Sequence, residues 1–407
     1  MRERVLLVNT VAGKGSVGRI VTGIAGRLKE KGTEPLIAFG RWDSPEGFNS
    51  VRINSSADIM LHGVMSRLTD KQGLYSERAT EKLTEAITRF DPDVIHLHNI
   101  HGYYLNYELL FSFLKNSFSG KDKKVIWTLH DCWSFTGHCV HFEFAECDKW
   151  KTGCFSCPEK KQYPASFLLD SSKSNYERKK MAFTGVPGLT LVTPSEWLKD
   201  KVKESFLKDY PVEVIPTGID LKAFNPEESD IREKFGIGKK TLLLGAANPW
   251  RERKGFNEFL KLASMLKGKD ILLALIGLNK KQAEEAGRYS NIIPLRKTDS
   301  LKEMVRWYSA ADIYVNLTLE DTFPTTNIEA MACGTPVITY RSGGSGEALT
   351  EKTGWIAEKR DLDSVIKGID EILSKDREEL KRACIERAAA YSAGSRFDEY
   401  IDLYNRE

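Results

Sequence analysis

The segment from Leu319 to Tyr340 (LEDTFPTTNIEAMACGTPVITY) carries the residues whose types and spacing most clearly predict binding chemistry. Asp321 and Glu329 lie eight positions apart, across a loop and the start of an expected helix. A carboxylate in the first turns of that helix can accept hydroxyl groups of a ribose, while its free N–H groups face phosphate oxygens. An acidic helix start stabilised by the helix dipole would explain one carboxylate but not both. The same stretch supplies further candidate ligand-binding residues: Thr325, Thr326 and Asn327.

A basic run follows the strand that we expect at Thr241–Ala247. It contains Arg251, Arg253 and Lys254 ahead of Gly255. Guanidinium and ammonium groups at the end of a strand can neutralise a departing diphosphate. An ordinary exposed basic loop is the alternative.

A glycine-rich loop near the amino end has the spacing G-x-G-x-x-G, with Gly13, Gly15 and Gly18 between an expected strand and an expected helix. Glycines allow the backbone to approach a phosphate at the helix N-terminus. A tight turn without a ligand would use the same residues. A dinucleotide-binding fold is a further alternative, because Arg41 at the end of the second strand would suit the 2′-phosphate of NADP.

Histidines stand where two neighbouring strands are expected to end. His98 closes the run VIHLH, and His130 and Asp131 follow the run VIWTL. In open α/β sheets ligands bind beyond the carboxyl ends of the strands, where imidazoles can donate to sugar hydroxyls or phosphate. His96 shares the strand of His98 and is expected to be structural.

A cysteine-rich stretch follows these histidines and ends in C-x-x-C, with His138 and His141 nearby. Its thiols belong to Cys139, Cys147, Cys154 and Cys157. Such spacing can close a tetrahedral structural zinc site. Small buried residues and a redox-labile pair are the alternatives, and we expect no catalytic zinc.

Short apolar runs alternate with helical patterns in both halves of the chain, which predicts doubly wound parallel sheets. In the first half the expected strands are Arg4–Asn9, Pro35–Phe39, Asp93–His98, Lys124–Leu129 and Leu189–Val192, and the expected helices cover residues 19–31 and 77–90. In the second half they are Thr241–Ala247, Ile271–Gly277, Asn291–Leu295, Asp312–Asn316 and Pro336–Thr339.

Composition supports two ordinary globular domains. The chain has 407 residues, of which 41% are hydrophobic, and its formal net charge of +3 is too small for a nucleic-acid-binding protein. The sequence contains neither a signal-peptide pattern at its start nor an apolar run of the length of a membrane span. We therefore expect a cytoplasmic protein with reduced thiols, and contact with the inner face of the cell membrane stays open.

Taken together, these motifs resemble glycosyltransferase family 4 over nearly the whole chain. The run DTFPTTNIEAMACGTPVI is similar to the family's two acidic residues separated by seven positions. The resemblance implies that Glu329 holds the nucleotide ribose and that Asp321 helps to hold the donor sugar. Asp321 departs from the usual glutamate by one methylene, and Glu320 is out of register.

Other segments extend the resemblance. Lys254 matches a phosphate-binding lysine, and Arg253 or Arg251 replaces an arginine that the family has where this chain has Pro249. TLHD resembles the segment whose histidine lies at the donor sugar. The resemblance implies these catalytic residues: His130, Arg253, Lys254 and Asp321. It implies these donor-binding residues: Glu329, Gly15, Gly18, Thr325, Thr326 and Asn327. On the acceptor side we expect His98 and Asp131.

The resemblance implies a GT-B fold, in which two facing Rossmann-like domains, each with a doubly wound parallel sheet, enclose a cleft. We expect an acceptor-side domain over 1–205 with a cysteine-rich insertion over 132–160, a nucleotide-sugar domain over 206–385, and a terminal helix over 386–407 that crosses back to the first domain.

The implied reaction moves a sugar from a nucleoside-diphosphate donor to an acceptor hydroxyl with retention at the anomeric carbon, and needs no cofactor. The acceptor would be a sugar or a lipid-linked oligosaccharide. The stretch HDCWSFTGHC is similar to a subgroup that acts in bacterial surface-polysaccharide assembly. Two alternatives stay open: an NADP-dependent oxidoreductase, and a non-catalytic GT-B module that binds a sugar nucleotide and zinc.

Overall fold

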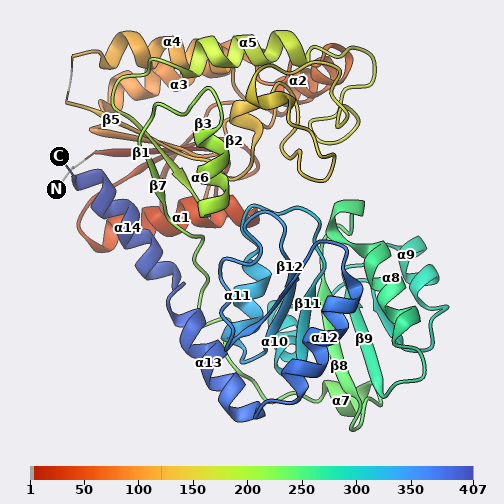
Figure 1. The fold of residues 1–407 in the computed structure, drawn as a ribbon. Coiled ribbons are helices and arrows are strands. Elements are labelled where there is room, and N and C mark those ends of the chain that lie inside the picture. The colour runs from red at the N-terminus through yellow and green to blue at the C-terminus, as the bar shows by residue number, and fades with distance from the viewer. Residues whose placement is uncertain (1–3, 121, 407) are drawn as a thin grey trace. The chain divides into compact units, whose positions relative to one another are not determined.

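Two parallel β-sheets, each packed against helices, organise the computed structural model, which describes residues 4–120 and 122–406 (Figure 1). The chain divides into two compact units. The first runs to Pro216 and also includes the chain from Arg396 onward, and the second is Thr217–Ser395. The doubly wound parallel class predicted from the sequence is confirmed in both units.

The first sheet has the strand order β3-β2-β1-β4-β5-β6-β7. Its strands are β1 (Val5–Val11), β2 (Leu36–Arg41), β3 (Asn49–Arg52), β4 (Val94–Leu97), β5 (Lys124–Thr128), β6 (Leu189–Thr193) and β7 (Val212–Val214). The helices around it are α1 (Gly15–Glu30), α2 (Ser56–Thr69), α3 (Glu77–Phe90), α4 (Tyr107–Phe118), α5 (Ser172–Phe183), α6 (Glu196–Lys203) and most of α14 (Ala393–Asn405), with short 3₁₀ turns η1 (Trp133–Phe135) and η2 (Lys149–Lys151).

Alternating side chains give the first sheet a core on each face, because successive residues of a strand point to opposite sides. Leu6 and Val8 of β1 face α3 and α4, and Val5 and Leu7 face α1 and α14. The register between β1 and β4 pairs Leu7 with His96. Both faces are therefore covered, as a parallel sheet requires.

The second sheet has the order β10-β9-β8-β11-β12-β13. Its strands are β8 (Thr241–Ala246), β9 (Ile271–Ile276), β10 (Ile292–Leu295), β11 (Ile313–Asn316), β12 (Val337–Tyr340) and β13 (Gly354–Ala357). Its helices are α7 (Ile231–Lys234), α8 (Phe256–Met265), α9 (Lys280–Ala286), α10 (Leu301–Ala310), α11 (Thr325–Ala332), α12 (Leu362–Leu373) and α13 (Arg377–Ala389), with the 3₁₀ turn η3 (Glu252–Lys254).

The structure corrects the predicted list of strands. Leu189–Val192 is not the last strand of the first unit, since β7, which the sequence analysis did not predict, follows it. The edge strands β3 and β13 were also missed. These edge strands are short and only partly buried, so they lack the apolar runs that identify central strands. None of the helices in the described ranges is both long and apolar enough to cross a membrane.

Candidate functional site

The predicted site residues gather where the strand order of each sheet reverses. The reversal lies between β1 and β4 in the first unit and between β8 and β11 in the second. In doubly wound sheets, ligands bind beyond the carboxyl ends of the strands at this point. The glycine-rich loop follows β1 and His98 follows β4, whereas Lys254 follows β8 and Asp321 follows β11. Each unit therefore has one candidate binding edge.

In the second unit, η3 carries the basic run toward the loop after β11. The Lys254 ammonium forms an ion pair with the Asp321 carboxylate, and the two side chains are 25% and 17% exposed. The Arg253 guanidinium donates to the backbone carbonyl of Glu320 at 3.0 Å. The basic and acidic segments, predicted separately, thus form one half-buried cluster.

Glu329 lies one turn into α11, and neighbouring hydroxyl groups orient its carboxylate. One oxygen accepts from the Thr325 hydroxyl and the other from the Tyr308 hydroxyl of α10, both at 3.1 Å. Burial and the nearby Glu329 charge raise the pKa of Tyr308 well above its usual value, so Tyr308 remains a donor. The half-buried Glu329 carboxylate is thus held in place, and a carboxylate so held can accept hydroxyl groups. Sequence reasoning missed Tyr308, because no motif marks it.

The amino end of α11 is a ready anion site. Pro324 is its N-cap, and among the described residues no side chain caps this end. By contrast, Ser300 caps α10 and Asp361 caps α12. First-turn N–H groups have no acceptor within their own helix, so those of Thr325 and Thr326 can bind phosphate oxygens.

Asn327 has a different environment from its neighbours. It is fully buried, its side-chain oxygen accepts from Asn316 at 2.8 Å, and its amide donates to the Ser345 carbonyl at 2.9 Å. The side chain therefore braces two loops. Gly343 (φ +55°) allows the backbones of the same two loops to approach closely, since a Cβ there would lie 1.9 Å from the carbonyl oxygen of Asp321.

In the first unit, the loop after β1 has glycine at positions 15 and 18 for two different structural reasons. Gly15 (φ +68°) begins α1, and an ideal Cβ there would meet nothing within 4 Å. Gly18 is packed, because a Cβ there would lie 3.0 Å from the Val11 side chain. Gly15 therefore borders open space, whereas Gly18 allows the helix to approach β1. Arg41, which supported the NADP alternative, packs its guanidinium over the Tyr103 ring, 5.4 Å from its centroid.

His98 and His130 meet beyond the ends of β4 and β5. His98 Nδ1 and His130 Nε2 are 3.1 Å apart, and the rings stack with centroids 5.4 Å apart. Burial lowers the pKa of His130 to about 4 and that of His98 well below its usual value. Both rings are therefore neutral at neutral pH, and one donates an N–H to the other. His96 hydrogen-bonds to Tyr404 and Thr128, which confirms its structural role.

Asp131 is held by a partner that sequence reasoning missed. His101 Nε2 lies 2.9 Å from one Asp131 oxygen, and the Trp133 amide donates to the other at 2.9 Å. Burial alone would raise the pKa of Asp131, but His101, His141 and the Trp133 amide together outweigh burial and the pKa falls to about 2. Asp131 is thus a fixed carboxylate beside the histidine pair. No spacing pattern could have linked His101 to it, because their contact joins two different loops.

The expected zinc site is not supported. Within residues 4–120 and 122–406, no group of three or more His, Cys, Asp or Glu side chains is arranged to hold a metal ion. The Cys139 thiol donates to Cys157, which raises the pKa of Cys139 and lowers that of Cys157. Cys154 accepts from the Gly137 amide at 3.1 Å. These thiols lie in one neighbourhood, since each alters the pKa of another, but they are not part of a metal-holding group among the described residues.

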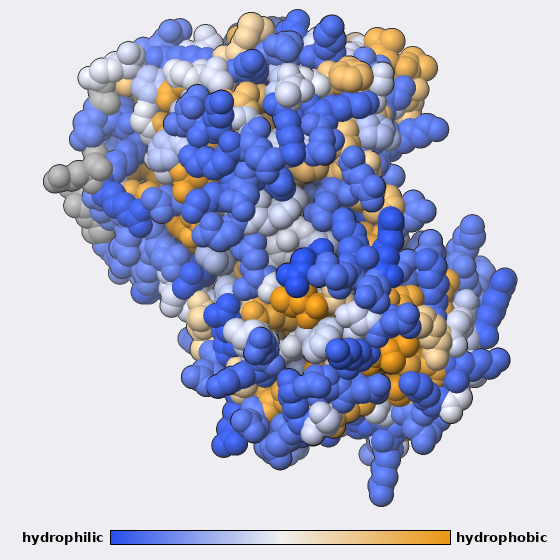
Figure 2. Space-filling model, viewed as in Figure 1, coloured by the Kyte–Doolittle hydropathy of each residue, from blue (hydrophilic) through white to orange (hydrophobic). Residues whose placement is uncertain are grey.

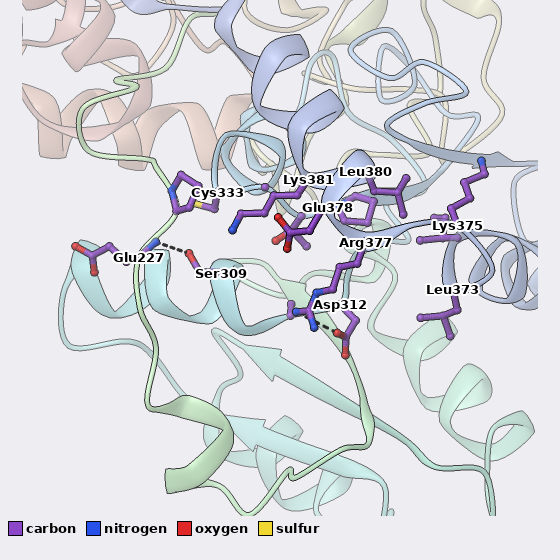
Figure 3. Close-up of a pocket in the computed structure, with 16 residues that line it drawn as sticks. Glu227, Ser309, Asp312, Cys333, Leu373, Lys375, Arg377, Glu378, Leu380 and Lys381 are labelled. Carbon is purple, nitrogen blue, oxygen red and sulfur yellow. Dashed lines mark hydrogen bonds and ion pairs between the residues drawn. The ribbon is translucent and has the colours of Figure 1, made fainter.

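A pocket of about 340 Å³ lies elsewhere in the second unit (Figure 3). Asp312 and Cys333, which precede β11 and β12, help to line it, so it lies at the amino edge of the sheet. Arg377 and Lys381 of α13 face it together with Glu378. It is on the opposite edge from Lys254 and contains none of the predicted site residues.

Comparison with known proteins identifies the family. Residues 17–223 match the pattern named Glycosyltransferase Family 4, and residues 227–391 match the pattern named Glycosyl transferases group 1. The chain belongs to glycosyltransferase family 4. Family 4 members transfer sugars from nucleoside-diphosphate donors with retention, and this chain is such a glycosyltransferase, as the sequence analysis predicted. The oxidoreductase and non-catalytic alternatives are therefore wrong.

Among relatives of this family 4 chain, WcaC of Escherichia coli (strain K12), a glycosyl transferase assigned provisionally to colanic acid biosynthesis, is 28% identical over 364 residues, which are 87% of this chain and 84% of WcaC. Sucrose-phosphate synthase of Thermosynechococcus elongatus has a similar fold, with a TM-score of 0.70, 16% identity and coverage of 99% and 98% of the two chains. HepE of Anabaena, solved with UDP and glucose, has a TM-score of 0.65, 13% identity and 99% coverage of both chains. These structures confirm the GT-B fold.

Proposed function

We propose that the second unit binds the sugar nucleotide through the cluster around α11. Glu329 accepts the ribose hydroxyls, the N–H groups of Thr325 and Thr326 bind the diphosphate together with Lys254, and Asp321 contacts the donor sugar. The observation that carries this proposal is the ion pair of Lys254 and Asp321 beside the uncapped α11 that bears Glu329. The Lys254 ammonium and the N-terminus of α11 then match the diphosphate, and the Glu329 carboxylate matches the ribose.

The chemical step follows from these positions. The bond from the anomeric carbon to the diphosphate oxygen breaks, and the acceptor oxygen bonds to the same face of that carbon. The leaving phosphate oxygen takes the acceptor proton, while Lys254 and Arg253 stabilise the charge that develops on the diphosphate. In the first unit, neutral His130 offers a hydrogen bond to a sugar hydroxyl as a catalytic residue, and His98 and Asp131 serve the acceptor side. Lys254, Arg253 and the helix ends supply the charge stabilisation in this proposal, so it involves no metal.

The similarity to WcaC supports a role in cell-surface polysaccharide assembly, with a sugar or lipid-linked oligosaccharide as acceptor. HepE, whose structure contains UDP and glucose, supports a nucleoside-diphosphate sugar as donor. For a lipid-linked acceptor, we propose that the enzyme acts in the cytoplasm at the inner face of the cell membrane.

The test is thermal stabilisation by a panel of UDP-, GDP-, ADP- and TDP-sugars plus NADP. We expect one class of sugar nucleotide to raise the Tm, because ligand at 100 times its Kd adds about 2.7 kcal/mol. Glu329→Gln should abolish the shift, whereas Glu284→Gln, an exposed glutamate of α9, should keep it. Stabilisation by NADP alone, or an unchanged shift in Glu329→Gln, would overturn the proposed site.

A further inference from the structure

Helix α2 has an inverted distribution of polar and apolar residues. The side that faces the first unit contains His62, Gly63 and Ser66, all buried. The side that faces solvent is aliphatic, with these exposed fractions: Met60 70%, Leu61 60%, Val64 49% and Leu68 40%. A surface helix normally buries its apolar side, so packing within this unit does not explain the pattern.

A neighbouring loop extends this apolar surface. Phe167, Leu168 and Leu169 are 65%, 66% and 55% exposed. The Phe167 amide donates to the Arg67 carbonyl at 2.8 Å and the Leu169 amide to the Leu68 carbonyl at 3.4 Å, so the loop lies against the end of α2. We call the combined surface the α2 patch, made of Met60, Leu61, Val64, Leu68, Phe167, Leu168 and Leu169. Figure 2 shows hydrophobic surface in this part of the first unit, at the upper right.

Hydrogen bonds of His62 and Asp70, together with ring contacts of His62 with Tyr75 and Tyr103, attach α2 to its unit. His62 Nδ1 lies 2.8 Å from the Ser76 hydroxyl, and its Nε2 accepts from the Gly73 amide at 3.1 Å. Asp70, at the end of α2, binds His138 and accepts from the Ser171 amide at 2.8 Å. The helix is thus fixed to its unit, and its aliphatic side chains remain exposed to solvent. Contiguous exposed apolar surface of this kind marks an interaction site.

Basic side chains border the patch. Arg67 is a residue of α2, and its guanidinium lies over the Tyr103 ring. The Lys160 ammonium donates to the Leu168 carbonyl at 3.4 Å. Lys71 directly follows α2 and Lys161 precedes the loop, and both are exposed. Of the nearby carboxylates, Asp70 is engaged by His138, and Asp170 accepts from the Cys157 and Ser172 amides. The patch therefore combines aliphatic side chains with a cationic border.

We propose that the α2 patch docks the first unit onto a bilayer surface that carries anionic lipid headgroups. The aliphatic side chains enter the boundary between headgroups and acyl chains, and the bordering lysines pair with lipid phosphates. A bilayer fits the combination of protruding aliphatic side chains and a cationic border, because it accepts both without a shape-matched partner surface. The inference deepens the proposed function and rests on it, since a lipid-linked acceptor is reached from a membrane surface.

Vesicle co-sedimentation tests this docking, with phosphatidylcholine alone and with added phosphatidylglycerol. We expect binding to the anionic vesicles that weakens with salt. Leu61→Asp combined with Phe167→Asp should reduce the bound fraction by about tenfold or more, because charged side chains do not enter the apolar boundary. Lys160→Glu with Lys161→Glu should weaken binding to anionic vesicles only. The matched control is Leu301→Asp on α10, a 52% exposed leucine of the second unit, which should bind like the unchanged protein.

Each contrary result overturns the docking inference. Absence of binding by the unchanged protein, or equal binding by the Leu61→Asp/Phe167→Asp variant, would do so. So would a concentration-dependent dimer in sedimentation velocity that this variant abolishes without any vesicle binding, since the patch would then join two copies. The sugar-nucleotide Tm shift is measured on the same variants. A retained shift with lost docking separates failure of this inference from failure of the donor site.

Discussion

The ion pair of Lys254 and Asp321 holds a half-buried ammonium beside the start of α11. Negative charge on a departing diphosphate grows as the bond to the sugar breaks, so in the proposed site this ammonium is expected to stabilise the transition state more than the ground state. Lys254→Met is expected to lower kcat by about 100- to 1000-fold. The measurement is release of nucleoside diphosphate under saturating donor. Lys267→Met, at an exposed position after α8, is the control, and equal kcat values in the two variants would contradict the role.

Buried neutral histidines make the first unit sensitive to acid. Burial lowers the pKa of His62 and His130 to about 4 and that of His96 to about 3. In the unfolded chain these groups bind protons near pH 6.5, so the unfolded state carries more protons as the pH falls below that value. Each contributes stability above pH 6.5 and loses up to about 1.4 kcal/mol per pH unit below it. We expect the Tm to fall between pH 7 and 5 and to stay level from pH 7 to 8, measured by circular dichroism. A constant Tm down to pH 5 would contradict this account.

The motifs identified single residues better than contacts between distant segments. Lys254, Asp321 and Glu329 were selected from short patterns, and the structure brings the first two together and places the third on the adjacent helix. Tyr308 and His101 were missed because each acts through a partner far along the chain. The cysteine spacing places several thiols in one neighbourhood, as the structure does, but no metal-holding group is found there among the described residues.

At the scale of elements, the loops around α11 depend on Gly343. Alanine there would combine an unfavourable positive φ with a Cβ placed 1.9 Å from the Asp321 carbonyl oxygen. Gly238→Ala is a matched control, because Gly238 has φ +59° and nothing within 4 Å of an added Cβ. The control should lose only about 1 kcal/mol. Gly343→Ala should lose more and also weaken sugar-nucleotide binding, as thermal shifts would show. Equal losses of stability and of sugar-nucleotide binding in both variants would indicate that the contact between Gly343 and the Asp321 carbonyl does not position the binding site.

Central strands were predictable and edge strands were not. The run RVLLVN predicts β1 because a strand buried on both faces is continuously apolar. By contrast, β3 has the sequence NSVR and β7 the sequence VEV, and both are partly exposed. Their place in the sheet depends on pairing with β2 and β6, which no local pattern encodes. The parallel class therefore followed from the central strands alone.

At the scale of the whole molecule, the chain leaves the first unit, forms the second and returns to the first through α14. Arg27 of α1 holds Asp398 with two hydrogen bonds, of 2.9 and 2.8 Å. Tyr404 places its hydroxyl 2.7 Å from His96 Nδ1, in the strand that leads to His98. Helix α14 thus forms part of the core beneath His98 in the first unit.

Removal of the chain after Ser392 should therefore destabilise the first unit selectively. Tyr400, Ile401, Leu403 and Tyr404 are buried against the first sheet, and each contributes about 1.5–3 kcal/mol. Their sum approaches the whole stability of an ordinary domain, about 5–15 kcal/mol. We expect the truncated protein to bind a hydrophobic dye and to lose one of its unfolding transitions in calorimetry, while the second unit still unfolds cooperatively. Tyr404→Phe removes only the hydrogen bond to His96 and should cost about 1 kcal/mol. A truncated protein with both transitions unchanged would show that α14 adds no stability to the unit that it covers.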